Sequence, residues 1–288
     1  MVEQLTSSKS YLRTKVSREI KKALTDVTPP VLTRLFAPKK IRRPTGSTAE
    51  NLYDNRIEID EDGPKTVEFL QGSPVLYISV EKLRYSGGVA YVNPNHPMRL
   101  YYREGLEALR NYYTRHQPTN IFEKHFLKSP MGRDYPSHGV PWSEPACGSK
   151  QAVMKEKGLS AEDHGVQHYG PVSEEKLMLE KGRLDDVRSS FEKSGYQPRY
   201  GFSVGYFLRR KGNDWVFVIV GGQHRVAAMA ELGFTHVPAQ FQPSYPRIVR
   251  EGQVNRWPMV RNNELTAEEA HMIFEAYFPV DRDLVYSE

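Results

Sequence analysis

The chain has 288 residues, of which 39% are hydrophobic and 26% are charged. This composition is ordinary for a globular protein with a buried core, and it argues against wholesale disorder. Cys147 is the only cysteine, which excludes an internal disulfide and a zinc site built from several thiols. No stretch approaches the roughly 20 apolar residues of a membrane span, and the start has no secretory signal, so we expect a cytoplasmic protein.

The positive charge gathers in the first residues. Residues 1–45 hold eleven Lys or Arg against three acids, a net charge of +8, whereas the whole chain carries +5, so the other 243 residues carry −3. Apolar residues at helical spacing between 16 and 36, broken by Pro29 and Pro30, predict a basic amphipathic arm. We expect residues 9–43 to bind the anionic surface at the inner face of the membrane. The alternative is that this segment forms a helix packed against the folded domain.

The polar, turn-rich residues 44–66 are typical of a linker, so we expect an arm and linker over 1–66 and a folded domain over 67–288. In that domain the patterns predict an opening strand at 75–80 and an extended turn at 92–99, where Pro94 and Pro97 exclude helix. A helix is expected around 103–116 and a long loop over 127–172. There follow, in order, a helix at 173–194, a hairpin of strands 200–208 and 215–220, a helix at 223–232, a strand at 236–241 and a helix at 266–277.

The strongest chemical signal lies at Gly221-Gly222. Residues 216–220 are apolar throughout, which predicts a strand buried on both faces that leads directly into this glycine turn. The helix that follows would offer unpaired N–H groups and a partial positive charge, and His224 and Arg225 would add donors. The sequence therefore predicts a phosphate-binding turn, with an ordinary Gly-Gly turn and an exposed His-Arg pair as the alternative.

Residues 216–242, from the apolar strand through GGQHR and AELG to VPAQ, resemble the ParB/sulfiredoxin superfamily. RLDDVRSSFEKSGYQP before them and YISVEKLRY with NPNHPMR earlier are similar to further motifs of that family. The resemblance covers about 75–105 and 177–242. It implies an α+β fold, a ParB/sulfiredoxin-like core enlarged by the basic arm, an insertion at 106–176 and a C-terminal extension with a helix at 243–288.

The resemblance also implies that nucleotide phosphates, from ATP or CTP, bind at Gly221, Gly222, Gln223, His224 and Arg225. Gln223 stands where a sulfiredoxin has its catalytic cysteine, and an amide is no nucleophile, which argues against sulfiredoxin activity. Only 46 residues follow position 242, too few for the DNA-binding domain of a partition protein. The acidic charge of the body also gives no strong case for DNA.

Phosphoryl transfer needs charge neutralisation, usually by Mg²⁺, and a carboxylate near the attacking hydroxyl. Glu81 and Glu180 are the candidate catalytic acids, with Arg183 and Arg99 in support. His164 and His168 have the spacing of a zinc pair, but Gly165 favours a loop, and we expect no metal held by the protein itself.

The leading hypothesis is a nucleotide-binding phosphotransferase or NTPase, and a loose resemblance of the arm suggests a role in bacterial surface-glycan synthesis. The alternatives are a non-catalytic nucleotide-dependent sensor or scaffold and a ParB-like nucleic-acid-binding protein.

Overall fold

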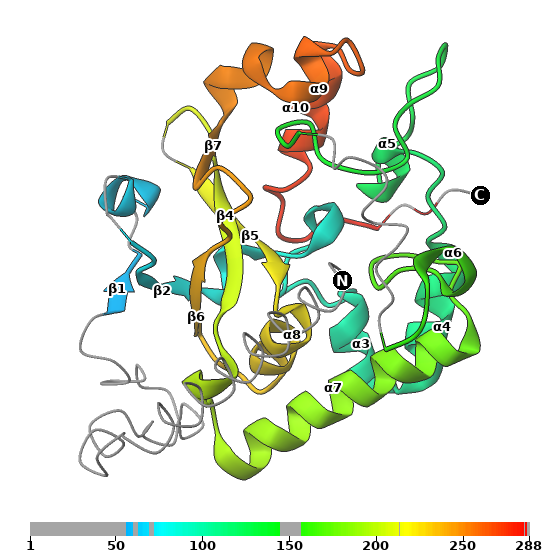
Figure 1. Cartoon of the computed structure of the whole chain (residues 1–288), viewed down its shortest axis with the longest axis vertical. Coiled ribbons are helices and arrows are strands. Elements are labelled where there is room, and N and C mark those ends of the chain that lie inside the picture. The colour runs from blue at the N-terminus through cyan, green and yellow to red at the C-terminus, as the bar shows by residue number, and fades with distance from the viewer. Residues whose placement is uncertain are drawn as a thin grey trace, which may run out of the picture. The chain divides into compact units, whose positions relative to one another are not determined.

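A computed structural model describes residues 56–59, 63–68, 72–144, 157–212, 214–284 and 286, all within the unit Lys40–Glu288 (Figure 1). The expected membrane arm at 9–43 and Cys147 lie outside the described residues. Helices combine with a mixed sheet of seven strands, in keeping with the expected α+β class. In the described part of the chain, no helix is both long and apolar enough to cross a membrane.

The strands are β1 (Arg56–Glu58), β2 (Val75–Ser79), β3 (Leu83–Arg84), β4 (Ser203–Arg209), β5 (Trp215–Gly221), β6 (His236–Phe241) and β7 (Ile248–Arg250). The α-helices are α3 (Pro97–Glu104), α4 (Leu106–Arg115), α5 (Ile121–Lys124), α6 (Ala161–His164), α7 (Glu174–Ser194), α8 (Gln223–Glu231), α9 (Pro258–Arg261) and α10 (Ala267–Glu275). Short 3₁₀ helices are η1 (Gly63–Val67), η2 (Val80–Lys82), η3 (Ser86–Gly88), η4 (Pro198–Tyr200) and η5 (Glu251–Arg256).

The β4–β5 hairpin forms the centre of the sheet, whose order is β1-β2-β6-β4-β5-β3. β4 and β5 run antiparallel, with Phe207 opposite Phe217. β6 and β7 both run parallel to β4, β6 along its first residues and β7 along its last, so they follow one another along one edge of that strand. On its other side β5 pairs with β3 at Phe217 and Val218, so among the described strands its last residues, which deliver the chain to the glycine turn, pair with β4 alone.

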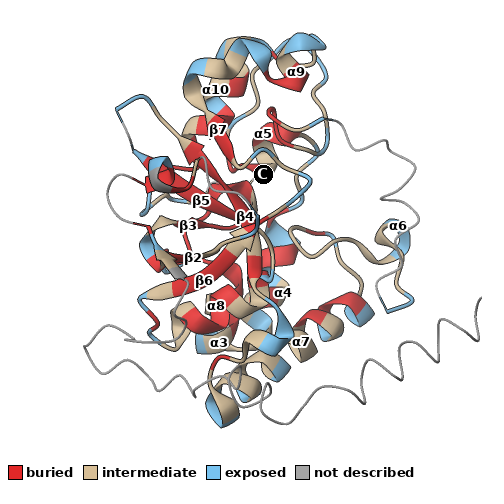
Figure 2. Ribbon diagram, turned by 60° about the vertical axis from the view of Figure 1, so that its left-hand side comes forward, coloured by how far each residue is buried: buried red, intermediate tan, exposed pale blue. Residues whose placement is uncertain are grey.

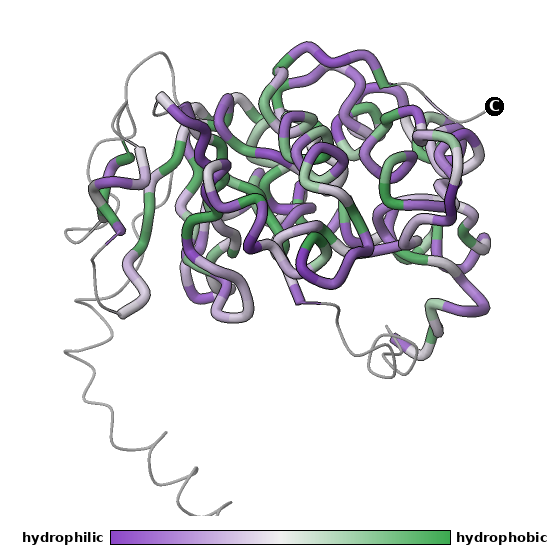
Figure 3. Tube along the Cα trace, turned by 90° about the horizontal axis from the view of Figure 1, so that it is seen from above, coloured by the Kyte–Doolittle hydropathy of each residue, from purple (hydrophilic) through white to green (hydrophobic). Residues whose placement is uncertain are grey.

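Both faces of the sheet are covered, which explains why β5 is apolar at successive positions. Phe217 and Ile219 belong to a core cluster that includes Leu177 and Leu184 of α7 and the inner residues of α8. The alternate residues of β5, Val216 and Val218, belong to a second cluster that also holds the inward residues of α5, α9 and α10. Because neighbouring side chains of a strand point to opposite faces, a strand covered on both sides reads as a continuous apolar run. The labelled strands are largely buried in Figure 2, and hydrophobic and hydrophilic stretches alternate along the chain in Figure 3.

The expected elements from 173 onward are confirmed. The Ser173 side chain accepts a hydrogen bond from the Lys176 N–H at the start of α7, and Gly195 ends this helix with a φ of 66°. The hairpin, α8 and β6 lie where the patterns place them. At α10, Thr266 and Glu269 form the expected capping box.

Three expectations about the first half are wrong. The expected linker contains β1, which pairs in parallel with β2. The expected extended turn contains the start of α3, because Pro97 stands in the first turn of this helix, where its missing N–H costs nothing. The expected helix at 103–116 is divided at Gly105, whose φ of 86° ends α3 and precedes α4.

Candidate functional site

The glycine turn joins the buried end of β5 to the start of α8. Gly222 has the left-handed backbone conformation, with φ 79° and ψ 24°. A Cβ at this position would lie 2.8 Å from the Ser203 Oγ and 3.0 Å from the Ser203 Cα, so both the backbone angle and the space require glycine. No side chain caps α8, whereas Ser173 caps α7 and Thr266 caps α10. A glycine N-cap has no side chain that could accept from the first N–H groups of α8.

A buried cluster of charged residues from α7 meets the first turn of α8. The His224 Nε2 lies 2.6 Å from the Glu180 Oε2, although 44 residues separate them in the sequence. The other carboxylate oxygen lies 2.9 Å from the Lys176 Nζ and 3.0 Å from the Arg183 Nη1. Glu180 is 1% exposed and Lys176 is 2% exposed. The fold thus brings Glu180 and Arg183 to the turn, as the sequence suggested, and adds Lys176.

The Glu180 carboxylate is ionised although it is buried. Burial alone would raise the pKa of Glu180, but the hydrogen bonds and charges of His224 and Lys176 outweigh it and hold the pKa at about 2. Glu180 is therefore ionised at neutral pH. An anion at the start of α8 would meet the helix dipole beside the side chains of His224, Lys176 and Arg183.

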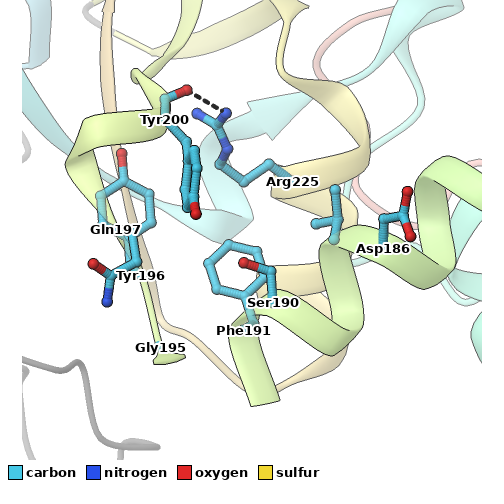
Figure 4. A pocket seen from close by; sticks show the side chains of 9 residues that line it. Asp186, Ser190, Phe191, Gly195, Tyr196, Gln197, Tyr200 and Arg225 are labelled. Carbon is cyan, nitrogen blue, oxygen red and sulfur yellow. Dashed lines mark hydrogen bonds between the residues drawn. The ribbon is translucent and has the colours of Figure 1, made fainter. Parts of the chain in front are cut away.

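Arg225 forms one wall of a neighbouring cavity. Its guanidinium donates to the Tyr200 carbonyl at 2.9 Å and to the Gly201 carbonyl (Figure 4). The cavity has a volume of about 180 Å³ and is lined mainly by side chains of the last turns of α7 and of the segment that follows, among them Phe191, Tyr196 and Tyr200. It is smaller than the roughly 300–1,000 Å³ of a drug-sized site, so it would accept one ring system rather than a whole nucleotide.

Two expected site residues lie far from the turn. Glu81 precedes β3, whose Leu83 pairs with Phe217, so Glu81 lies beside the beginning of β5 while the turn lies at its end. Arg99 forms an ion pair with Glu231, the last residue of α8, at 2.9 Å, which places it at the opposite end of that helix. The structure therefore does not bring Glu81 or Arg99, the expected catalytic acid and supporting residue, to the turn. Both residues lie in earlier motifs of the resemblance, and membership of such a motif does not give the distance of a side chain from Gly221 in the folded chain.

Residues that sequence reasoning missed come from the insertion. The Gln167 Nε2 donates to the Gln223 Oε1 at 2.6 Å, and the Gln223 Nε2 donates to the Ile219 carbonyl at 3.3 Å. Gln223 is thus fixed by a side chain 56 positions away, rather than exposed at the turn. The neighbouring His168 Nδ1 lies 3.1 Å from the Tyr85 hydroxyl. The only advance signal was the length of the loop, since long loops in a domain are often functional.

The donors near the turn do not form a site for a metal held by the protein. In the described ranges there is no group of three or more His, Cys, Asp or Glu side chains that could hold a metal ion. His164 ends α6 and its Nδ1 lies 2.8 Å from the Ser173 Oγ, while His168 lies against Tyr85. The oxygens of Glu180 already contact Lys176, Arg183 and His224.

Comparison of the chain with protein-family models, with curated proteins and with solved structures found no match.

Proposed function

We propose that this protein binds a nucleoside triphosphate, ATP or CTP, at the start of α8 and is a nucleotide-dependent phosphotransferase or NTPase built on a ParB/sulfiredoxin-like core. The observation that carries the proposal is the contact between Glu180 and His224. It ties a buried cluster of charged side chains to a helix start whose N-cap is a left-handed glycine without a side-chain cap. Buried, ionised groups of this kind cost stability, and they concentrate at functional sites.

In this proposal, different residues bind the phosphates and the base of the nucleotide. The N–H groups of α8, together with His224, Lys176 and Arg183, suit the phosphates, because charge-assisted hydrogen bonds to phosphate oxygens are strong. The cavity beside Arg225 suits the base, because its aromatic side chains can stack on a planar ring. Since Arg225 belongs to the first turn of α8 and donates to the Tyr200 carbonyl in the cavity wall, it would join the two subsites.

Magnesium belongs to this proposal only as the ion that accompanies the triphosphate. Mg²⁺ is commonly bound through substrate phosphates and one or two carboxylates. Glu180, the acid at the turn, is engaged by Lys176, Arg183 and His224, and these contacts fit a positioning role better than that of a metal ligand.

One observation favours the non-catalytic alternative, a nucleotide-dependent sensor or scaffold. Glu180 holds His224 and two further cations, and its low pKa makes it a poor acceptor for a substrate proton. A site with anion-binding groups and no proton acceptor would bind nucleotide without turning it over. The two functions differ in phosphate release and not in binding.

The test is calorimetric titration of the folded protein with ATP and with CTP in the presence of Mg²⁺, followed by measurement of phosphate release. We expect Arg225→Ala to weaken binding by about 1.5–3 kcal/mol, roughly 10- to 150-fold, the range for a hydrogen bond to a charged group. Arg256→Ala is the matched control, because Arg256 is exposed on η5 and lies outside the site. Equal affinity of the wild type and Arg225→Ala would place the nucleotide site elsewhere.

A further inference from the structure

The segment 165–170 of the insertion is fixed firmly against α4. The Tyr112 hydroxyl donates to the His168 carbonyl at 2.6 Å, and the Tyr113 hydroxyl donates to the Gln167 carbonyl at 2.9 Å. The Gly170 N–H donates to the His116 carbonyl at 2.8 Å, and a Cβ on Gly170 would lie 1.8 Å from the Tyr113 carbonyl oxygen. The backbone of this segment is therefore positioned by several partners, although it has no regular secondary structure.

This segment reaches the phosphate turn directly. The Gln167 side chain bonds to that of Gln223, the first residue of α8, at 2.6 Å. The next residue of each segment is a histidine: His168 follows Gln167, and His224 follows Gln223 and contacts Glu180. The charges of Glu180, His224 and Lys176 act on the imidazole of His168, so it lies within electrostatic reach of that cluster.

The tautomer of His168 depends on which acceptor receives the proton of the Tyr85 hydroxyl. The Tyr85 hydroxyl lies 3.4 Å from the Gln167 carbonyl, to which it donates, and 3.1 Å from the His168 Nδ1. A hydroxyl has a single proton, so when this proton is given to the carbonyl the bond with Nδ1 must use a proton on the imidazole. Nδ1 is then the protonated nitrogen and Nε2 carries the lone pair. Within the described chain no partner bonds to Nε2.

The surroundings keep His168 neutral before a substrate binds. Its pKa is lowered to about 4, mainly by burial; the charges of Lys124, His224 and Lys176 act in the same direction, and the charge of Glu180 acts against them. These groups come from α5, α7 and α8, the helices near the segment. An anionic triphosphate would raise the pKa of the imidazole toward the working pH, which is the condition for an effective proton acceptor.

We propose that His168 is the general base of the phosphotransfer, an inference that rests on the proposed function. Its Nε2 takes the proton of the attacking hydroxyl while that oxygen bonds to the γ-phosphorus. The bond from the γ-phosphorus to the bridging oxygen breaks, and the nucleoside diphosphate leaves with the bonding electron pair. Gln167 and Tyr85 are positioning residues, since they orient the loop and the imidazole, and Glu180 positions His224. When water is the acceptor, the products are inorganic phosphate and the nucleoside diphosphate.

The test uses the full chain with Mg²⁺ and ATP or CTP, water being the acceptor. We expect His168→Ala to keep nucleotide affinity within about twofold and to lower the rate of phosphate release by about 10²- to 10⁴-fold, the range of general-base catalysis. Added imidazole should restore part of this rate. His138→Ala is the matched control, because His138 is exposed and contacts only Ser137 among the described residues. An unchanged rate in His168→Ala, or a wild type that binds nucleotide and releases no phosphate, overturns the proposal.

A second measurement does not depend on turnover or on a folded alanine variant. In nucleotide-free protein with ¹⁵N-labelled histidine, the side-chain nitrogen shifts should show His168 with a protonated Nδ1 and an unprotonated Nε2. Tyr85→Phe, which removes the acceptor for Nδ1–H and keeps the ring, should shift this balance and lower the rate of phosphate release about tenfold at unchanged affinity. An Nε2–H tautomer in the wild type overturns the role of His168 as base. A wild type that binds neither nucleotide overturns the proposed function itself, whatever the tautomer.

Discussion

Gly222 shows how one position can set the geometry of the whole turn. Its φ of 79° is unfavourable for residues with a side chain, and Ser203 of β4 occupies the space where a Cβ would stand. The backbone can therefore pass from β5 into α8 beside β4 only when this residue is glycine. The same feature leaves the first N–H groups of α8 uncovered by a side chain.

Gly222→Ala should lower the free energy of unfolding by more than Gly233→Ala. Both glycines have a φ of 79°, and left-handed backbone costs an alanine about 1–2 kcal/mol. At Gly233 no atom lies within 4 Å of the added Cβ, whereas at Gly222 the Cβ meets Ser203. Urea unfolding of the two variants separates backbone strain from the contact. Equal losses would show that β4 adjusts without cost.

The role of Glu180 follows from the side chains that it contacts rather than from its residue type. A carboxylate near a phosphate site could bind a metal, accept a proton or hold cations in place. The contacts with Lys176, Arg183 and His224 favour the third role. The sequence could identify the residue, but the distances to its neighbours distinguish these roles.

At the scale of elements, α7 and α8 are held together by apolar packing and by one ionic link. Leu177 and Leu184 of α7 share a core cluster with Val226 and Ala227 of α8. Glu180 lies between these leucines in the sequence, one turn from each, and bonds to His224. The helix pair therefore buries a charge network within an apolar contact, where removal of one partner leaves the others uncompensated.

Glu180→Gln should lower the free energy of unfolding at pH 7 by about 3 kcal/mol, near the lower end of the cost of breaking a buried ion pair. The pKa of Glu180 is depressed to about 2, so its contribution is complete above its ordinary value of about 4.5 and is lost as the pH falls toward 2. The difference between wild type and variant should therefore shrink over that pH window.

Glu192→Gln is the matched control on the same helix, because Glu192 is exposed and pairs only with Arg188 among the described residues. Its unfolding free energy should stay within about 0.5 kcal/mol of the wild type. A difference for Glu180→Gln that does not change between pH 7 and pH 3 would contradict the ionic assignment.

At the scale of the whole molecule, charge is divided between a basic N-terminal stretch and a mildly acidic remainder. The stretch 9–43 combines most of the excess charge with apolar residues at helical spacing and a Pro-Pro break. We expect it to attach the protein reversibly to anionic membrane, since each Lys or Arg near such a surface contributes about 1 kcal/mol.

Binding to liposomes should rise with the fraction of anionic lipid and fall at high salt, because salt screens surface charge. Removal of residues 1–43 should abolish this binding and leave nucleotide affinity and the melting temperature nearly unchanged. Liposomes of neutral lipid are the control. A truncated protein that unfolds would instead show that apolar residues such as Ile20 and Leu24 belong to the core.

The sequence by itself determined the elements whose signals are local. The apolar run of β5, the glycines after it, the caps at Ser173 and Thr266 and the hairpin all depend on residues a few positions apart, so the pattern predicted them. It could not predict β1, because a short edge strand in a polar stretch is recognised only by its partner β2.

Only the tertiary structure decided which side chains surround the turn. Glu81 and Glu180 were equal candidates in the sequence, but the parallel register of β3 with β5 removes Glu81, whereas the packing of α7 on α8 brings Glu180 to His224. Gln167 and His168 lie in a stretch without periodicity, and tyrosines of α4 position them. The physical reason is that hydrophobic periodicity, turns and caps depend on residues a few positions apart. A site joins side chains from segments that are distant in the sequence, and only their packing sets the distances between them.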